Sequence, residues 1–304
     1  MSIALCEAKS VSDKPQAKNP QDATAAGTAP LGREALIAGI TYYGILAALP
    51  HIRGVPPAVG IIAGTVLFLL LSLAVIRNIA LWEIKPLHEF FLLAYPLAAW
   101  YSVTVWAEQY QHAAPFISPL ESLLFLVTCA FLGRLLSRLV REVNMLVPIA
   151  IVLLLVDIFT VFFGPTGEAL DKVPELVSRL SIGLPAVGSA VGPEGARGFG
   201  FIASAGLGDF IFLALFFAAT WRYGLRFDRT FWYIFALVAV AMLGSLALPF
   251  LPGIPLLPFI AIGFLIANTG QFTFTQQEKL YLLIAVIFIG AFIAVGVLLT
   301  QYLK

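Results

Sequence analysis

Two aspartates are the residues of this sequence whose type and position could do chemistry. Asp157 lies inside the hydrophobic run 145–164, and Asp209 lies inside the hydrophobic run 199–220. Ionised groups are expensive in hydrocarbon, so a carboxylate in such a run predicts a functional site. Two facing carboxylates in a low-dielectric site share one proton, because both cannot easily ionise. One can then accept a proton from water while the other protonates a carbonyl oxygen, which is chemistry that hydrolyses a peptide bond.

The second aspartate ends the sequence Gly206-Leu207-Gly208-Asp209. Glycines beside a carboxylate remove side chains and let another backbone approach closely. In a membrane helix they also allow close packing of two helices. The motif therefore suits a site that admits an extended peptide, and helix packing alone is the alternative.

A third element is Pro255-Leu256-Leu257-Pro258, at the start of a later apolar run. Two prolines remove two backbone donors and leave carbonyls free. Irregular backbone of this kind is tolerated in lipid mainly where protein or a water-filled cavity covers it. The alternative is a short turn between helices at the membrane surface.

The composition of the chain indicates the fold class that positions these residues. Of 304 residues, 60% are hydrophobic and 12% are charged, with mean hydropathy +0.95, whereas a soluble domain carries roughly a quarter charged residues. We therefore expect an all-α polytopic membrane protein. The net charge of +1 gives no basic surface for nucleic acid. Cys6 and Cys129 form neither a metal-ligand pattern nor a disulfide framework.

The chain divides into four predicted parts. Residues 1–33 form a disordered polar tail, 34–144 hold N-terminal transmembrane helices, 145–270 hold Asp157, GLGD and PLLP, and 271–304 hold one more transmembrane helix. The nine predicted spans are about 34–50, 55–76, 87–107, 117–133, 145–164, 200–221, 230–250, 254–269 and 280–302. Alternating crossings from a cytoplasmic N-terminus place 13 of the 18 Lys and Arg inside, as the positive-inside rule favours. We expect Arg134, at a span end, to snorkel to the interface.

The longest predicted connection is 165–199, between the two aspartate spans. Its first half has the apolar spacing of a short interfacial helix, and its second half is rich in Gly, Pro, Ala and Ser. Loops of this length are often lids or binding segments, and an exposed linker is the alternative.

Together these elements resemble the presenilin and signal-peptide-peptidase family of intramembrane aspartyl proteases. That family carries an aspartate in one helix, GxGD in the next and a PAL motif at the start of a later helix. Here the order is Asp157, GLGD at 206–209 and PLLP at 255–258. GLGDFIF at 206–212 and VDIFTVFFGPTG at 156–167 also look like presenilin. The resemblance covers about residues 145–270.

Three features depart from the family pattern. Val156 replaces the usual Tyr before the first aspartate, and Leu256 occupies the position of the Ala in PAL. Four predicted spans precede Asp157 where the family has five, and one extra span follows the PLLP segment. The charge count also places the long loop outside, as in signal peptide peptidase and opposite to presenilin.

The resemblance implies a function and a set of site residues. Asp157 and Asp209 would be the catalytic pair, and the expected substrate-binding residues are Gly206, Leu207, Gly208, Pro255, Leu256 and Leu257. Separately from the resemblance, the Gly-rich composition around Gly198–Phe201 suggests that this segment pairs with an unwound substrate as a strand. The substrate would be a single-pass membrane protein or a signal-peptide-like helix, with no metal or organic cofactor. A prokaryotic plasma membrane is the expected location.

Other functions stay open from sequence alone. Intramembrane aspartates also serve proton- or cation-coupled transporters. A catalytically silent relative that binds membrane helices is another alternative, because of Val156 and Leu256. A zinc protease is disfavoured, since His88-Glu89 lacks the second histidine of HExxH, and no GxSG string indicates a serine protease.

Overall fold

The computed structural model describes residues 31–52, 54–109, 114–162, 181–183, 204–247 and 255–302. All of them belong to the compact unit Leu31–Lys304. The predicted tail (apart from 31–33), the predicted interfacial helix in 165–199 and the segment Gly198–Phe201 lie outside the described residues.

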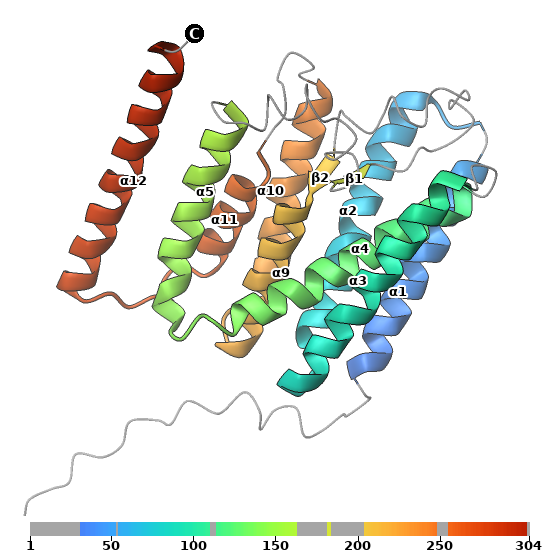
Figure 1. Ribbon diagram of the computed structural model, residues 1–304, viewed down its shortest axis with the longest axis horizontal. Coiled ribbons are helices and arrows are strands. Elements are labelled where there is room, and N and C mark those ends of the chain that lie inside the picture. The colour runs from blue at the N-terminus through green and yellow to red at the C-terminus, as the bar shows by residue number, and fades with distance from the viewer. Residues whose placement is uncertain are drawn as a thin grey trace, which may run out of the picture. The chain divides into compact units, whose positions relative to one another are not determined.

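The described residues are mainly helical, and an α-helix coincides with each of the nine predicted apolar segments (Figure 1). The α-helices are α1 (Leu31–Ala48), α2 (Pro57–Leu81), α3 (Pro86–Gln109), α4 (Ala114–Ser137), α5 (Leu146–Phe162), α9 (Leu207–Arg222), α10 (Phe227–Ala247), α11 (Leu257–Ala267) and α12 (Gln276–Tyr302). Two 3₁₀ turns, Leu49–His51 and Val143–Met145, and two short strands, β1 (Ser181–Gly183) and β2 (Ser204–Gly206), complete the elements.

Four helical segments are long and apolar enough to cross a membrane: Ala58–Leu81, Phe116–Ser137, Val143–Thr160 and Phe227–Ser245. These segments identify the chain as a membrane protein by length and composition. The helix α11 has 11 residues, so it rises only about 16 Å, roughly half of the ~30 Å hydrocarbon core. It is therefore too short to cross by itself.

Two sequence-based boundaries are corrected by the structure. Leu31, Gly32 and Arg33 belong to α1 rather than to the tail, and Gly32 lies against the Trp82 ring, where an added Cβ would be 3.0 Å from it. Among the described residues of the predicted span 200–221, the helix begins at Leu207, because residues 204–206 form β2. Gly206 disfavours helix and acts as the N-cap of α9.

The core is built around α2, α4 and α9, which pack against one another. The helix α2 also contacts α1 and α10, and α4 contacts α1 and α3. The helices α5 and α11 pack together, and α12 packs against α5 (Figure 1). The Asp209 helix is thus held centrally by α2, α4, α10 and α11.

Two glycines allow the closest helix contacts. At Gly133 in α4, an added Cβ would lie 2.6 Å from Ala214 Cβ and 2.8 Å from Leu215 N on α9. At Gly263 in α11, it would lie 3.1 Å from the backbone of Ile234 on α10. A side chain at either position would push two helices apart.

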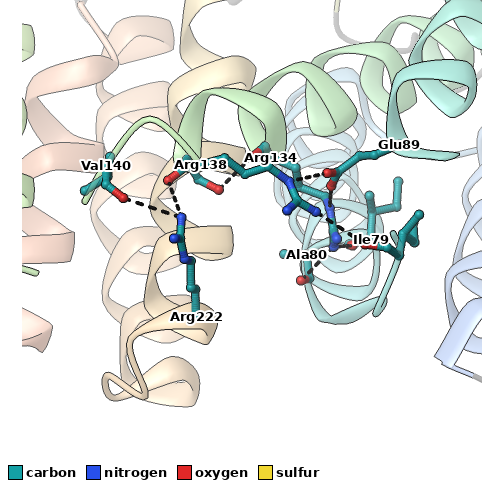
Figure 2. Close-up of polar contacts among 9 residues, drawn as sticks. Ile79, Ala80, Glu89, Arg134, Arg138, Val140 and Arg222 are labelled. Carbon is teal, nitrogen blue, oxygen red and sulfur yellow. Dashed lines mark hydrogen bonds and ion pairs between the residues drawn. The ribbon is translucent and has the colours of Figure 1, made fainter. Parts of the chain in front are cut away.

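A buried ion cluster joins α2, α3 and α4, contrary to the prediction that Arg134 snorkels. Arg134 Nε and Arg138 Nε donate to the two carboxylate oxygens of Glu89, at 2.5 and 2.6 Å (Figure 2). Arg134 also donates to the carbonyls of Ile79 and Ala80, in the last turn of α2. Glu89 is 1% exposed and Arg134 is 8% exposed, so Arg134 is held inside the fold by a carboxylate that local sequence does not reveal.

Candidate active site

Asp157 lies two thirds of the way along α5 and is half-buried. Its Oδ2 accepts a hydrogen bond of 3.1 Å from the backbone N–H of Leu257, the first residue of α11. The first N–H groups of a helix have no partner within the helix, and the helix dipole favours negative charge there. The N-terminus of α11 therefore holds and stabilises the Asp157 carboxylate.

Asp209 lies in the first turn of α9, where a strand turns into a helix. Its Oδ2 accepts a hydrogen bond of 2.9 Å from the backbone N–H of Gly206, the N-cap residue. This is the acidic half of a capping box, in which the third helical residue binds back to the N-cap. Gly206 is also the last residue of β2, whose pairing with β1 sets Ser181 opposite Gly206. The position of Asp209 is thereby tied to a strand end.

The two aspartates both lie near the N-terminal end of α11. They come from helices that both pack against α11 (Figure 1). Leu257 binds Asp157, and its neighbour Leu256 lines a small cavity together with Asp209. The PLLP segment therefore contacts Asp157 and lies beside Asp209. Apart from the bonds from Leu257 and Gly206, the described residues donate no hydrogen bond to either carboxyl group.

The three motifs lie at similar distances from one end of the helices that carry them. At a rise of about 1.5 Å per residue, Asp157 lies about 16 Å from Leu146, where α5 begins. On the same rise, Asp209 lies about 20 Å from Arg222, where α9 ends, and Leu257 lies about 16 Å from Asn268. These three helix ends must lie near one level for the motifs to meet.

A set of polar contacts, which we call the polar belt, joins those ends. Tyr223 Oη donates to the Val140 carbonyl at 2.7 Å. Arg222 donates to the same carbonyl (Figure 2). Asn144 Nδ2 donates to the Thr273 carbonyl at 2.8 Å. These bonds attach the chain entering α5 to the end of α9 and to the loop after α11.

Asn268 is the buried centre of the polar belt. Its Oδ1 accepts from the backbone N–H of Arg226 at 3.0 Å, and its Nδ2 donates to Thr230 Oγ1 at 2.8 Å and to the Phe264 carbonyl. Asn268 is fully buried, so these bonds fix the end of α11 against the α9–α10 turn. The polar belt therefore fixes the positions of these helices relative to one another along their axes.

The residues predicted to bind substrate have different surroundings. Pro255, Leu256 and Leu257 are buried, and the Leu256 carbonyl is used by the first turn of α11, where it accepts from Phe259 and Ile260. It is thus not one of the free carbonyls that the two prolines predicted. The backbone N–H of Leu257, which sequence reasoning did not single out, is the group that reaches Asp157.

The GLGD glycines border open space within the described part of the chain. A Cβ added to Gly206 would meet only Asp209 Oδ2, at 3.7 Å, and one added to Gly208 would meet nothing within 4 Å. Leu207 between them is half-buried. Close packing of another helix does not explain Gly208, whereas it does explain Gly133.

Searches against protein-family models, curated proteins and solved structures found no match for this chain.

Proposed function

We propose that this chain is an intramembrane aspartyl protease, presenilin-like in its catalytic half, that hydrolyses peptide bonds within transmembrane helices. The observation that carries the proposal is that Asp157 and Asp209, from two different helices, both lie at the N-terminus of α11. Asp157 accepts a hydrogen bond from the first residue of α11, and Asp209 lines a cavity with the residue that precedes it. Their half-buried setting favours a shared proton.

The proposed reaction uses one carboxylate and one carboxylic acid. The carboxylate removes a proton from water, the water oxygen attacks the peptide carbonyl carbon, and the acid protonates the carbonyl oxygen. The C–N bond then breaks as the nitrogen receives the proton of the newly formed carboxylic acid. One hydroxyl of the tetrahedral intermediate gives its proton to the other carboxylate as the new carboxyl group forms, so one carboxylate and one carboxylic acid are restored. Each Oδ2 is held by a backbone N–H, from Leu257 or Gly206, so Oδ1 of each group is the atom we assign to water and substrate. Acid–base help of this kind contributes about 10²–10⁴-fold.

The substrate in this proposal is a single-pass membrane protein or a signal-peptide-like helix that unwinds locally. Strand β2 ends one residue before the GLGD helix, and an extended substrate that pairs with an edge of this small sheet is directed toward Asp209. The open space at Gly208 gives its backbone room. We place the strand contact at Ser204–Gly206 rather than at Gly198–Phe201.

We further propose that the nine helical segments form a multi-pass protein in a prokaryotic plasma membrane, with a cytoplasmic N-terminus. The distribution of Lys and Arg supports this orientation. The polar belt and the Glu89 cluster then lie toward the cytoplasmic side, because both lie at helix ends joined by the predicted inside loops. The acids lie about 16–20 Å from that end, inside the hydrocarbon layer.

The test uses purified protein in liposomes with a spanning-helix substrate. We compare wild type with Asp157→Asn and Asp209→Asn, which keep side-chain size but cannot ionise, and with Asp228→Asn, an exposed acid, as control. We expect cleavage to fall at least about 100-fold in both site variants and to stay unchanged in the control. Proton or cation flux without cleavage would instead support a transporter, and substrate binding without cleavage a silent relative.

A further inference from the structure

A small apolar cavity lies beside Asp209. It has a volume of about 20 Å³, which is room for a single water-sized group. Four helices supply its walls, which include Leu73, Leu213, Val238, Met242 and Leu256. Among the described residues that line it, Asp209 has the one polar side chain.

This cavity is a poor site for a water molecule. A buried water makes about three hydrogen bonds to polar groups, and the Asp209 carboxyl group alone cannot supply them. The remaining side chains around the cavity are aliphatic, aromatic or thioether groups. Its chemistry matches an apolar group of about the same size, which is a methyl group.

The position of the cavity connects it to the proposed reaction. Asp209 belongs both to the acid pair and to the cavity wall. Leu256, on the wall, directly precedes Leu257, whose N–H binds Asp157. A peptide bond held between the two carboxyl groups has a flanking side chain within reach of this cavity, because a residue spans only about 3.8 Å.

We infer that the cavity is a side-chain subsite that selects substrates with alanine or glycine beside the cleaved bond. The inference rests on the proposed protease function and adds its substrate class: membrane helices with a small residue at the cleavage position. Leu256 and Val238 determine this specificity, because their side chains occupy space that a larger substrate side chain needs.

The walls are closely packed, which makes the size limit strict. Leu73 is fully buried, and Val238 and Met242 are 3% and 2% exposed. Packed cores resist even one added methylene. One methylene more or less in an apolar pocket changes specificity by about 10–200-fold, so valine and leucine should be cleaved far more slowly than alanine.

The experiment pairs two opposite changes at one wall residue. Val238→Ala enlarges the cavity and Val238→Leu fills it, while Val240→Ala, an exposed position on the same helix, is the control. The substrates are one spanning helix with Gly, Ala, Val or Leu at either residue flanking the cleavage site mapped by mass spectrometry. The measured quantity is kcat/KM relative to the glycine substrate, which places nothing in the cavity.

We expect wild type and Val240→Ala to prefer Ala over Leu at least about tenfold at one of the two positions. Val238→Ala should reduce that ratio several-fold, and Val238→Leu should lower cleavage of the Ala substrate while sparing the Gly substrate. Leu256→Ala changes a wall residue at the start of another helix, and it should reduce the same ratio as Val238→Ala does. It replaces the Val238 variants in the test if one of them fails to fold.

Two results would overturn the subsite. Either wild type cleaves all four substrates equally at both positions, or folded cavity variants keep the wild-type ratios. In both cases cleavage itself persists, so the protease proposal survives. Absence of cleavage of every substrate by folded wild type rejects the protease proposal, and the subsite with it.

Discussion

The substitution Gly133→Ala tests how strictly packing positions the Asp209 helix. Gly133 in α4 lies at a close contact with α9. It faces atoms of α9 residues that follow Asp209 by two to six positions. An added Cβ would be 2.6 Å from Ala214 Cβ and 2.8 Å from Leu215 N, and closer still to the Ile211 carbonyl. Two of these three atoms are backbone, so no side-chain rotation can relieve the clash.

The size of the effect follows from these distances. Ordinary contact begins at 3.4 Å, so the helices must separate by about 1 Å. Overpacking of this kind costs about 1–3 kcal/mol of folding free energy. A displacement of 1 Å at a reacting group can lower the rate by about 100-fold. We therefore expect Gly133→Ala to lower both the unfolding temperature and the cleavage rate, the rate more strongly.

The assay compares Gly133→Ala with Gly44→Ala. Both glycines lie inside helices, but a Cβ at Gly44 meets nothing within 4 Å. Alanine there should leave cleavage unchanged and stabilise by about 0.5–1 kcal/mol through helix propensity. Thermal unfolding and cleavage kinetics are measured on both variants. Wild-type unfolding and cleavage by Gly133→Ala would show that the α4–α9 contact does not position Asp209.

Three further predictions address other parts of the molecule. Glu89→Gln leaves two arginines without their carboxylate and should lower the free energy of unfolding by about 3–5 kcal/mol. Asp228→Asn breaks an exposed ion pair and should lower it by about 1 kcal/mol or less. Equal losses for the two variants in chemical denaturation would contradict this. Asn268→Ala removes the buried centre of the polar belt and should lower the free energy of unfolding by about 1–3 kcal/mol, which lowers the unfolding temperature. An unchanged unfolding temperature would show that the polar belt does not stabilise the fold. Gly208→Ala meets no described atom, so it should keep the unfolding temperature but raise KM at least several-fold; an unchanged KM would show that substrate does not use this space.

Much of the helical architecture is predictable from the sequence, because long apolar runs in a membrane protein have few alternatives to helix. Each predicted segment coincides with an α-helix. The exception within those runs is the approach to GLGD, where glycine permitted a strand, β2, that hydropathy alone does not distinguish from helix. Gly206-Leu207-Gly208-Asp209 lacks the Ser/Thr-x-x-Glu/Gln pattern of a capping box, so the N-cap role of Gly206 was not predicted.

Contacts between distant residues were not predictable. The partner of Arg134 is Glu89, which lies on another helix and looks like an ordinary helix-start acid in the sequence. The bond from Leu257 to Asp157 uses a backbone N–H, and backbone donors carry no sequence signature beyond the helix start itself. Side-chain chemistry indicated Asp157 and Asp209, whereas the group that orients Asp157 depends on how α11 packs against α5.

The most direct measurement of the central claim follows the oxygen of water. A spanning-helix substrate is incubated in H₂¹⁸O with wild type, Asp157→Asn and Asp209→Asn, and the products are weighed by mass spectrometry. The account predicts one ¹⁸O atom in the new carboxyl terminus with wild type, and no product from either folded variant. Cleavage that persists in one of the two variants, or a folded wild type that yields no labelled product from any spanning helix, would contradict it.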